Sequence, residues 1–216
     1  MSQLILYQGD FGIVLVTDSR AVQFNHSGDP HYFTLSKLYP LNPMTVLATV
    51  GAGYGQQLCA AFQERIRRLP RARGEDVTEL AFHFFEEELR TRAVQDNEQE
   101  DPELRRVYFV IAGAITENTQ APLGFVVYAS DHATDPLHPL ATGHFVCIPR
   151  QLSVETRLQQ LAVDQTSWDQ VEEYCTRFLQ RMAVATDDIG PPFLITRVST
   201  DGIKTRVVEM GPEEKV

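Results

Sequence analysis

The sequence predicts an α+β fold, a four-layer α/β/β/α sandwich in which two antiparallel sheets are flanked by helix pairs. Strand-like apolar runs come in blocks, and a pair of helix-like segments, rather than one helix, follows each of the first two blocks. The strand-like runs are also nearly continuous in apolar residues, as expected for strands buried on both faces. The length of 216 residues fits one domain, residues 1–216, with a substantial core.

The first block contains four expected strands, at residues 3–8, 11–17, 33–39 and 44–51. The first two form a hairpin, because Gly9-Asp10 separates two apolar runs. The segment 25–31 has the Asn, Gly and Pro content of a loop.

Helix pairs follow this block and the next one, with expected helices at 54–69, 75–89, 153–162 and 167–185. Apolar residues repeat at helical spacing in the first, second and fourth of these segments, and Ser167 and Gln170 form a capping-box pattern. The remaining strands are expected at 107–115, 123–130, 143–148, 193–198 and 203–209, the last two turned at Asp201-Gly202. The acidic segment 95–103 and the segment 131–140 read as loops.

Composition excludes several partners and sites. Lys and Arg number 19 against 29 Asp and Glu, giving a net charge of −10, so neither nucleic acid nor an anionic membrane is an expected partner. No apolar run is long enough to span a bilayer, and no secretory signal pattern is present. The three cysteines, Cys59, Cys147 and Cys175, do not have the spacing of metal ligands, and they indicate buried thiols in a reducing cytoplasm. No metal and no cofactor are expected.

Ser2 is the first candidate catalytic residue. A Met followed by a small residue is the usual substrate of methionine aminopeptidase, so removal of Met1 would leave Ser2 with a free α-amine beside its own hydroxyl. The hydroxyl can attack a carbonyl, and an amine with a pKa near ~8 can carry the proton. Ser is also a common second residue, so its identity alone does not establish this role.

The residues that follow strengthen that interpretation. The run 12–17 ends in Asp18-Ser19-Arg20, and Asp18 lies 16 positions after Ser2. With the element order, this arrangement resembles the N-terminal-nucleophile hydrolases, in particular the proteasome β-subunit and its bacterial relatives, the HslV-type peptidase and the Anbu-type homologues. Members begin their mature chain with Thr or less often Ser, which is the position of Ser2. These residues do not separate the subfamilies.

The resemblance implies a role for each matching residue. Ser2 is the expected nucleophile, Lys37 supplies a nearby ammonium that favours negative charge, and Asp18 fixes Lys37. The turn Gly51-Ala52-Gly53 is the expected oxyanion hole, with the donating amide left open between Gly51 and Ala52. A solvated lysine and a turn that only starts a helix are the alternatives for these last two features.

Accessory groups that hold the N-terminus match less well. Family members place a Ser after a Gly in the mid-chain strands and an Asp with a Ser near the last helix. Here the candidates are Gly143 with His144, where no Ser is present, and Asp187 or Asp188, again with no Ser nearby on the C-terminal side. The motif residues Ser19 and Arg20 are further accessory candidates. His144 could replace a hydroxyl, although a structural histidine is the more common case.

The resemblance implies a peptidase subunit that cleaves unfolded peptides through an acyl-enzyme ester on Ser2. It also implies a homo-oligomer, ring or stacked, and an ATPase as a candidate partner. Two alternatives stay open: a catalytically inactive subunit with a structural role, which the missing Ser residues favour, and a small-amide hydrolase or peptide ligase on the same fold.

Overall fold

The computed structural model describes residues 2–25, 27–69, 74–95, 106–115, 123–130, 136–164 and 167–210. The chain forms two compact units, one comprising residues 1–37, 143–198 and 203–216 and the other residues 38–142 and 199–202. Each unit contains a five-stranded sheet and a pair of helices, so the α+β class with two antiparallel sheets and two helix pairs is confirmed. That the whole chain is a single domain stays a prediction.

The sheet of the first unit is built around the amino-terminal hairpin, in the order β10-β1-β2-β11-β12. Its strands are β1 (Leu4–Gly9), β2 (Gly12–Thr17), β10 (Phe145–Ile148), β11 (Phe193–Ser199) and β12 (Gly202–Val208). The hairpin register runs from Leu4 opposite Thr17 to Gly9 opposite Gly12. Gly12 has a φ of 129°, which a residue with a side chain rarely adopts. This confirms the hairpin that the Gly9-Asp10 pair predicted.

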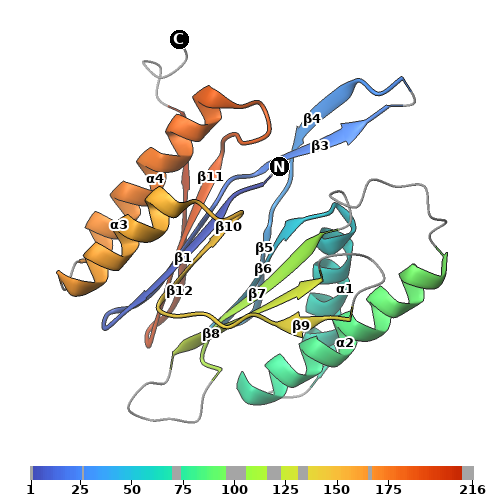
Figure 1. The fold of residues 1–216 in the computed structure, drawn as a ribbon. Coiled ribbons are helices and arrows are strands. Elements are labelled where there is room, and N and C mark those ends of the chain that lie inside the picture. Colours follow the sequence, from blue (N-terminus) through green and yellow to red (C-terminus); the bar gives the residue numbers. More distant parts are fainter. Residues whose placement is uncertain are drawn as a thin grey trace. The chain divides into compact units, whose positions relative to one another are not determined.

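Helices α3 (Leu152–Val163) and α4 (Trp168–Ala185) cover one face of this sheet, as Figure 1 shows. Side chains at alternating positions of β1 and β2, such as Ile5 and Val16, form a buried cluster with both helices. Helix α4 begins where it was predicted, and the N–H of Ser167 donates to Oε1 of Gln170 at 3.1 Å, as its capping box requires.

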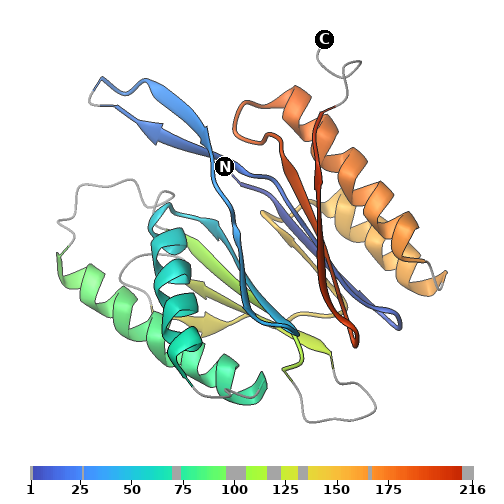
Figure 2. The ribbon, with the colours of Figure 1, turned by 180° about the vertical axis from the view of Figure 1, so that it is seen from behind.

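The second unit has a sheet in the order β5-β6-β7-β8-β9. Its strands are β5 (Leu38–Asn42), β6 (Thr45–Gly51), β7 (Val107–Gly113), β8 (Gly124–Ser130) and β9 (His138–Pro139). Helices α1 (Tyr54–Arg68) and α2 (Gly74–Gln95) lie along it (Figure 2). The two-residue strand β9 lies in a segment that was expected to be irregular.

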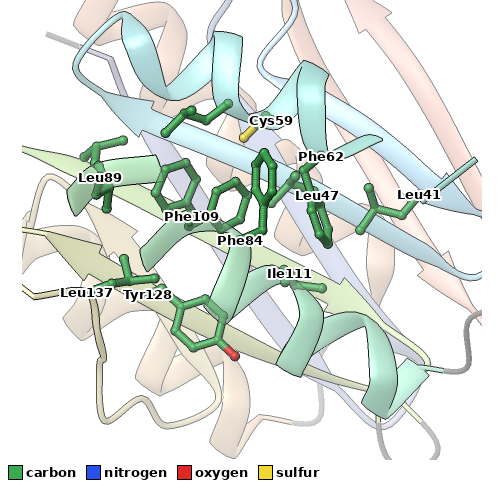
Figure 3. Close-up of a cluster of buried hydrophobic side chains, with 14 of the residues drawn as sticks. Leu41, Leu47, Cys59, Phe62, Phe84, Leu89, Phe109, Ile111, Tyr128 and Leu137 are labelled. Atoms are coloured by element: carbon green, nitrogen blue, oxygen red, sulfur yellow. The ribbon is translucent and has the colours of Figure 1, made fainter. Parts of the chain in front are cut away.

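Aromatic side chains fill the core of the second unit (Figure 3). The rings of Phe85 and Phe109 stack with centroids 3.9 Å apart, and Phe62 lies 5.3 Å from the rings of both Phe84 and Phe85. Stacked and tilted aromatic pairs add to the stabilisation from burial alone. The helix pair is therefore fixed to β7 by the apolar stripes that predicted the two helices.

The expected strand at 33–39 is wrong. Residues Pro30–Thr34 form β4, which pairs with β3 (Arg20–Phe24) in a separate two-stranded ribbon, and Leu38 starts β5 in the second unit. The chain changes partner at 35–37, where the N–H of Leu35 donates to the carbonyl oxygen of Ser19. Apolar content alone did not reveal this division, because both pieces are strand-like.

The boundaries of two helices differ from the prediction. Helix α3 extends one residue beyond each expected end, and α2 ends at Gln95, the first residue of the expected acidic loop. The rest of that loop, 96–103, and residues 131–135 lie outside the described residues. Among the helices that the structure describes, none has the length and apolar character needed to cross a membrane.

Candidate active site

Asp18 and Lys37 form a buried ion pair in the first unit. Nζ of Lys37 lies 2.8 Å from Oδ1 of Asp18, and neither side chain has any exposed surface. Nζ also donates to the carbonyl oxygen of Arg20 at 2.7 Å. A buried charge is costly unless it is paired and hydrogen-bonded, and both conditions are met here. The sequence-based pairing of Asp18 with Lys37 is thus present in the structure.

The carboxylate of Asp18 also binds the backbone on both sides of the hairpin. Its Oδ1 accepts the N–H of Gln3 at 2.9 Å, and its Oδ2 accepts the N–H of Arg20 at 3.1 Å. Asp18 follows the last residue of β2, where the chain leaves the strand and its side chain can turn back toward β1. One oxygen atom therefore contacts both the Lys37 ammonium and the residue next to Ser2.

Ser2 is half-buried and immediately precedes this contact. Successive side chains of an extended chain point to opposite faces, so Ser2 shares a face with Leu4, while Gln3 shares one with Ile5 and the helix-facing cluster. An ammonium has three donors. Asp18 and Arg20 take two of those of Lys37.

Burial changes the acidity of Lys37. Loss of hydration lowers the pKa of Lys37 from the usual 10.5, and the nearby Asp18 carboxylate opposes that effect by attraction and hydrogen bonding. The ammonium therefore gives up its proton more readily than a lysine in water does. Such an ammonium can stabilise developing negative charge or exchange a proton with a neighbouring hydroxyl.

The segment around Asp187 and Gly190 is joined to the turn that follows Asp18. Nη1 of Arg20 donates to the carbonyl oxygen of Asp187 at 2.9 Å, and the N–H of Ser19 donates to the carbonyl oxygen of Gly190 at 3.3 Å. A Cβ added to Gly190 would lie 2.2 Å from Nε of Arg20, so a side chain at this position would displace the guanidinium of Arg20. The segment thus supports Arg20, whose own carbonyl oxygen binds Lys37.

The predicted accessory acids differ in what they contribute there. Asp187 uses its backbone carbonyl oxygen rather than its carboxylate to hold Arg20, and the N–H of Asp188 donates to Oγ1 of Thr186 at 3.3 Å. The hydroxyl of Ser19 is buried, and it has no hydrogen-bond partner among the described residues. The late segment therefore contacts Arg20 and Ser19 through its backbone, and an accessory role for Asp187 or Asp188 stays a prediction.

Gly143 and His144 are not brought to Ser2. The carbonyl oxygen of His144 accepts the N–H of Gln8, near the far end of β1, and the side-chain positions of Gly143 and His144 are exposed. Six residues of extended chain separate Gln8 from Ser2, a distance of about 20 Å. The structure therefore does not support the expected accessory role of these two residues beside the nucleophile.

Gln3 was not among the predicted site residues. This residue is 1% exposed, and its Nε2 donates to the carbonyl oxygen of Pro149 at 3.1 Å and to Sγ of Cys147 at 3.3 Å. Its backbone carbonyl oxygen accepts bonds from Oγ1 of Thr17 and from the N–H of Asp18. A polar residue at the start of an otherwise apolar run was the available signal.

The predicted oxyanion turn lies in the second unit, at the end of β6. Gly51 has a φ of 106°, and a Cβ there would lie 2.2 Å from the carbonyl oxygen of Arg106. The N–H of Ala52 already donates to that oxygen at 2.8 Å. Because hydrogen-bonded and non-hydrogen-bonded pairs alternate along an antiparallel ladder, the N–H of Gly51 points away from β7. On the other side of β6, the pairing with β5 ends at Ala48, three residues before Gly51. The N–H of Gly51 is therefore the candidate donor for the oxyanion hole.

Gly53 differs from Gly51. It caps α1 with an ordinary φ of −60°, and nothing lies within 4 Å of where its Cβ would be. The geometry therefore does not require glycine at this position, whereas it does at Gly51.

The cysteines do not offer an alternative nucleophile. All three are free and buried, and burial raises the pKa of the Cys147 thiol to about 12. Burial likewise raises the pKa of Cys59 and of Cys175. A thiol with a raised pKa carries little thiolate at neutral pH. Within the described residues, no group of three or more His, Cys, Asp and Glu side chains is placed to hold a metal ion.

No protein-family model and no curated protein matches the sequence. Solved structures do match. In the helical assembly of the Anbu complex from Pseudomonas aeruginosa, the matched chain is 16% identical, with a TM-score of 0.71 over 98% of this chain and 87% of that chain. Anbu (ancestral beta-subunit) from Yersinia bercovieri is 14% identical, with a TM-score of 0.68 over 98% and 89%.

The chain has an Anbu-like fold. A Gly-1 mutant of Anbu from Hyphomicrobium sp. strain MC1 gives the same result, with 12% identity and a TM-score of 0.67 over 99% of this chain and 89% of that one. The match includes both units, so the expected proteasome-like fold is confirmed, and the Anbu-type part of the resemblance is supported. The HslV-type part stays a prediction. At this level of identity the likeness establishes the fold, and the activity has to be argued from the residues.

Proposed function

We propose that the protein is a proteasome-like peptidase subunit in which Ser2, exposed by removal of Met1, is the nucleophile. The observation that carries the proposal is the fully buried pair of Lys37 and Asp18, whose shared oxygen also binds the N–H of the residue after Ser2. A buried lysine is rare in a structural role, because its desolvation has to be offset. Lys37 shares an oxygen of Asp18 with the residue that follows a candidate N-terminal nucleophile, and this arrangement gives it a proposed chemical use.

The proposed reaction proceeds in two halves. The hydroxyl of Ser2 adds to the peptide carbonyl carbon while its proton moves to the α-amine, and Lys37 stabilises the negative charge that develops. The amine then protonates the leaving nitrogen, the peptide bond breaks, and an ester remains on Ser2. Water, deprotonated by the same amine, attacks the ester. This releases a carboxylic acid and restores the hydroxyl and the amine.

The oxyanion of each tetrahedral intermediate requires a fixed donor. We assign this role to the backbone N–H of Gly51, since that of Ala52 is already bonded. Close approach of a substrate backbone is easiest where no side chain intervenes, and the exposed Gly51 and Gly53 flank the turn.

Unfolded peptides are the proposed substrates, and a homo-oligomer is the proposed working form. One structural neighbour is described as a helical assembly of the Anbu complex, which supports a stacked arrangement of copies as the first arrangement to test. An ATPase partner and a cytoplasmic location remain part of the proposal. Light scattering at several protein concentrations measures the assembly directly.

The proposal is tested by combining intact mass with peptide hydrolysis. The mass determines whether Met1 is absent. The Met1-free protein is expected to hydrolyse fluorogenic peptides, and Ser2→Ala is expected to abolish hydrolysis. Hydrolysis by a chain that retains Met1, or by Ser2→Ala, would refute the mechanism.

A catalytically inactive subunit is the second candidate function. The position of His144, about 20 Å along β1 from Ser2, favours it, because the residue expected to replace the accessory hydroxyl does not reach the site. This candidate predicts that a Met1-free, correctly assembled preparation has no hydrolytic activity on any peptide.

A further inference from the structure

Gln3, which directly follows Ser2, forms hydrogen bonds through its backbone N–H, its backbone carbonyl oxygen and its side-chain nitrogen. Its backbone N–H binds Asp18, and its backbone carbonyl oxygen accepts from Thr17 and Asp18. Its side-chain nitrogen donates to Pro149 and Cys147. Chain termini are usually poorly ordered unless such contacts fix them. The contacts of Gln3 therefore fix the position from which Ser2 extends.

The contact of Gln3 with Pro149 lies just beyond the paired residues of β1 and β10. The register between β1 and β10 ends with Leu4 opposite Ile148, and Pro149 is the residue that follows β10. The side chain of Gln3 donates to the Pro149 carbonyl oxygen in the place where the ladder stops. This side-chain bond extends the attachment to the β10 side by one residue beyond Leu4, the first residue of β1.

The burial of Gln3 indicates how strictly this contact is set. A primary amide that is 1% exposed is costly to bury without partners, so the amide holds its hydrogen bonds rather than exchanging them for water. Its neighbours on the same face, including Ile5 and Cys147, belong to the helix-facing core. The side chain has an apolar surrounding and few other arrangements available.

We infer that Gln3 is a positioning residue that holds Ser2 in register with Asp18 and Lys37. The side chain anchors the strand on the β10 side, and the backbone N–H anchors it to the carboxylate that also binds Lys37. The inference rests on the proposed function of Ser2. Gln3 itself does not touch the reacting atoms. A small displacement of a nucleophile can reduce turnover strongly while substrate binding is kept.

Gln3→Met tests the inference, because Met has a similar volume and no donor. In Met1-free protein, kcat for a fluorogenic peptide is expected to fall about 10- to 100-fold with KM within about twofold. Gln3→Asn keeps the amide but shortens the side chain by one methylene, and the same loss is expected. Gln8→Met, at the other end of β1, is the matched control and is expected to keep wild-type kcat. Thermal unfolding of each variant establishes that it folds.

The outcomes separate this inference from the proposed function. A folded Gln3→Met or Gln3→Asn protein with wild-type kcat overturns the positioning role and leaves the role of Ser2 intact. A loss of kcat as large in Gln8→Met as in Gln3→Met also overturns it. Wild-type protein that lacks Met1 and hydrolyses nothing overturns the proposed function, and the inference about Gln3 with it.

Discussion

The ammonium of Lys37 lies 2.8 Å from Oδ1 of Asp18, and neither side chain reaches solvent. The two residues come from different parts of the chain, one directly after β2 and one in the connection between β4 and β5. Folding brings them together beside the start of β1. Because an ion pair of this kind is expensive to bury, its energetic cost is explained best by a chemical role.

Replacing Lys37 by Met is expected to lower kcat/KM by at least about 100-fold. Met fills a similar volume but has no charge and no donor, so the proposed mechanism loses the ammonium that stabilises the developing negative charge. Peptide hydrolysis by Met1-free protein measures the effect. The exposed Lys204 on β12 provides the control, and Lys204→Met is expected to have wild-type activity. Equal activity of the two variants would remove Lys37 from the mechanism.

The pH profile of kcat/KM is expected to be bell-shaped. Activity should rise as the Ser2 amine loses its proton, at or below about pH 8, because the amine must act as a base. It should fall when Lys37 loses its proton, below 10.5, because burial lowers the pKa of Lys37. A profile without an alkaline limb below 10.5 would contradict the assignment.

Lys37 also links stability to pH. Its pKa is lower in the folded chain than the usual 10.5, so below 10.5 the unfolded chain binds more protons at this site. Stability therefore rises with pH in the window between the lowered value and 10.5. The free energy of unfolding, measured by urea denaturation across this window, should gain more with pH in wild-type protein than in Lys37→Met. An equal slope would show that the lysine is not desolvated.

Gly51→Ala is expected to destabilise the protein and to reduce activity, whereas Gly53→Ala is expected to change both little. A Cβ on Gly51 would meet the Arg106 carbonyl oxygen at 2.2 Å, in a backbone conformation with φ of 106°. A Cβ on Gly53 meets nothing within 4 Å. Thermal unfolding and peptide hydrolysis of the two variants measure the difference. Similar behaviour of both would argue against Gly51 as the strained donor.

Glu172 is expected to stabilise the packing of α4 on the first sheet. Its side chain is 5% exposed and binds both Arg197 and Arg206, the latter at 3.0 Å. Glu172→Ala should cost about 2 kcal/mol of unfolding free energy, since it removes charged hydrogen bonds from a buried group. The control is Asp169→Ala, which removes an 86% exposed partner of Arg197 and should cost under about 1 kcal/mol. Urea denaturation of both variants gives the comparison.

Local sequence signals predicted most of the fold. The hairpin at Gly9-Asp10, the four helices and the capping residues at Ser167 and Gln170 depend on nearest neighbours in the chain, which periodicity and turn chemistry report directly. The ribbon of β3 and β4 was missed because its formation depends on which strand each piece pairs with. That choice is made at residues 35–37 by a contact with Ser19, which no local pattern encodes.

The site residues likewise include some that the sequence predicted and some that depend on strand pairing. Asp18 was predicted from its spacing to Ser2 and Lys37 from the family resemblance, and the structure brings these two together. Gly143 and His144 were misplaced because the register of β10 against β1 decides which residue lies beside the N-terminus. That register brings Pro149 to Gln3 instead. Nothing in the sequence alone specified it.

The central claim is that Ser2 provides both a nucleophilic hydroxyl and a free amine. A peptide epoxyketone tests both at once, because the hydroxyl adds to its ketone and the amine opens its epoxide, so the whole reagent is added to the chain. Intact mass of the treated Met1-free protein is predicted to show one adduct per chain, located on Ser2 by peptide mapping and absent from Ser2→Ala. No adduct on the wild-type chain, or an unchanged adduct on Ser2→Ala, would contradict the account.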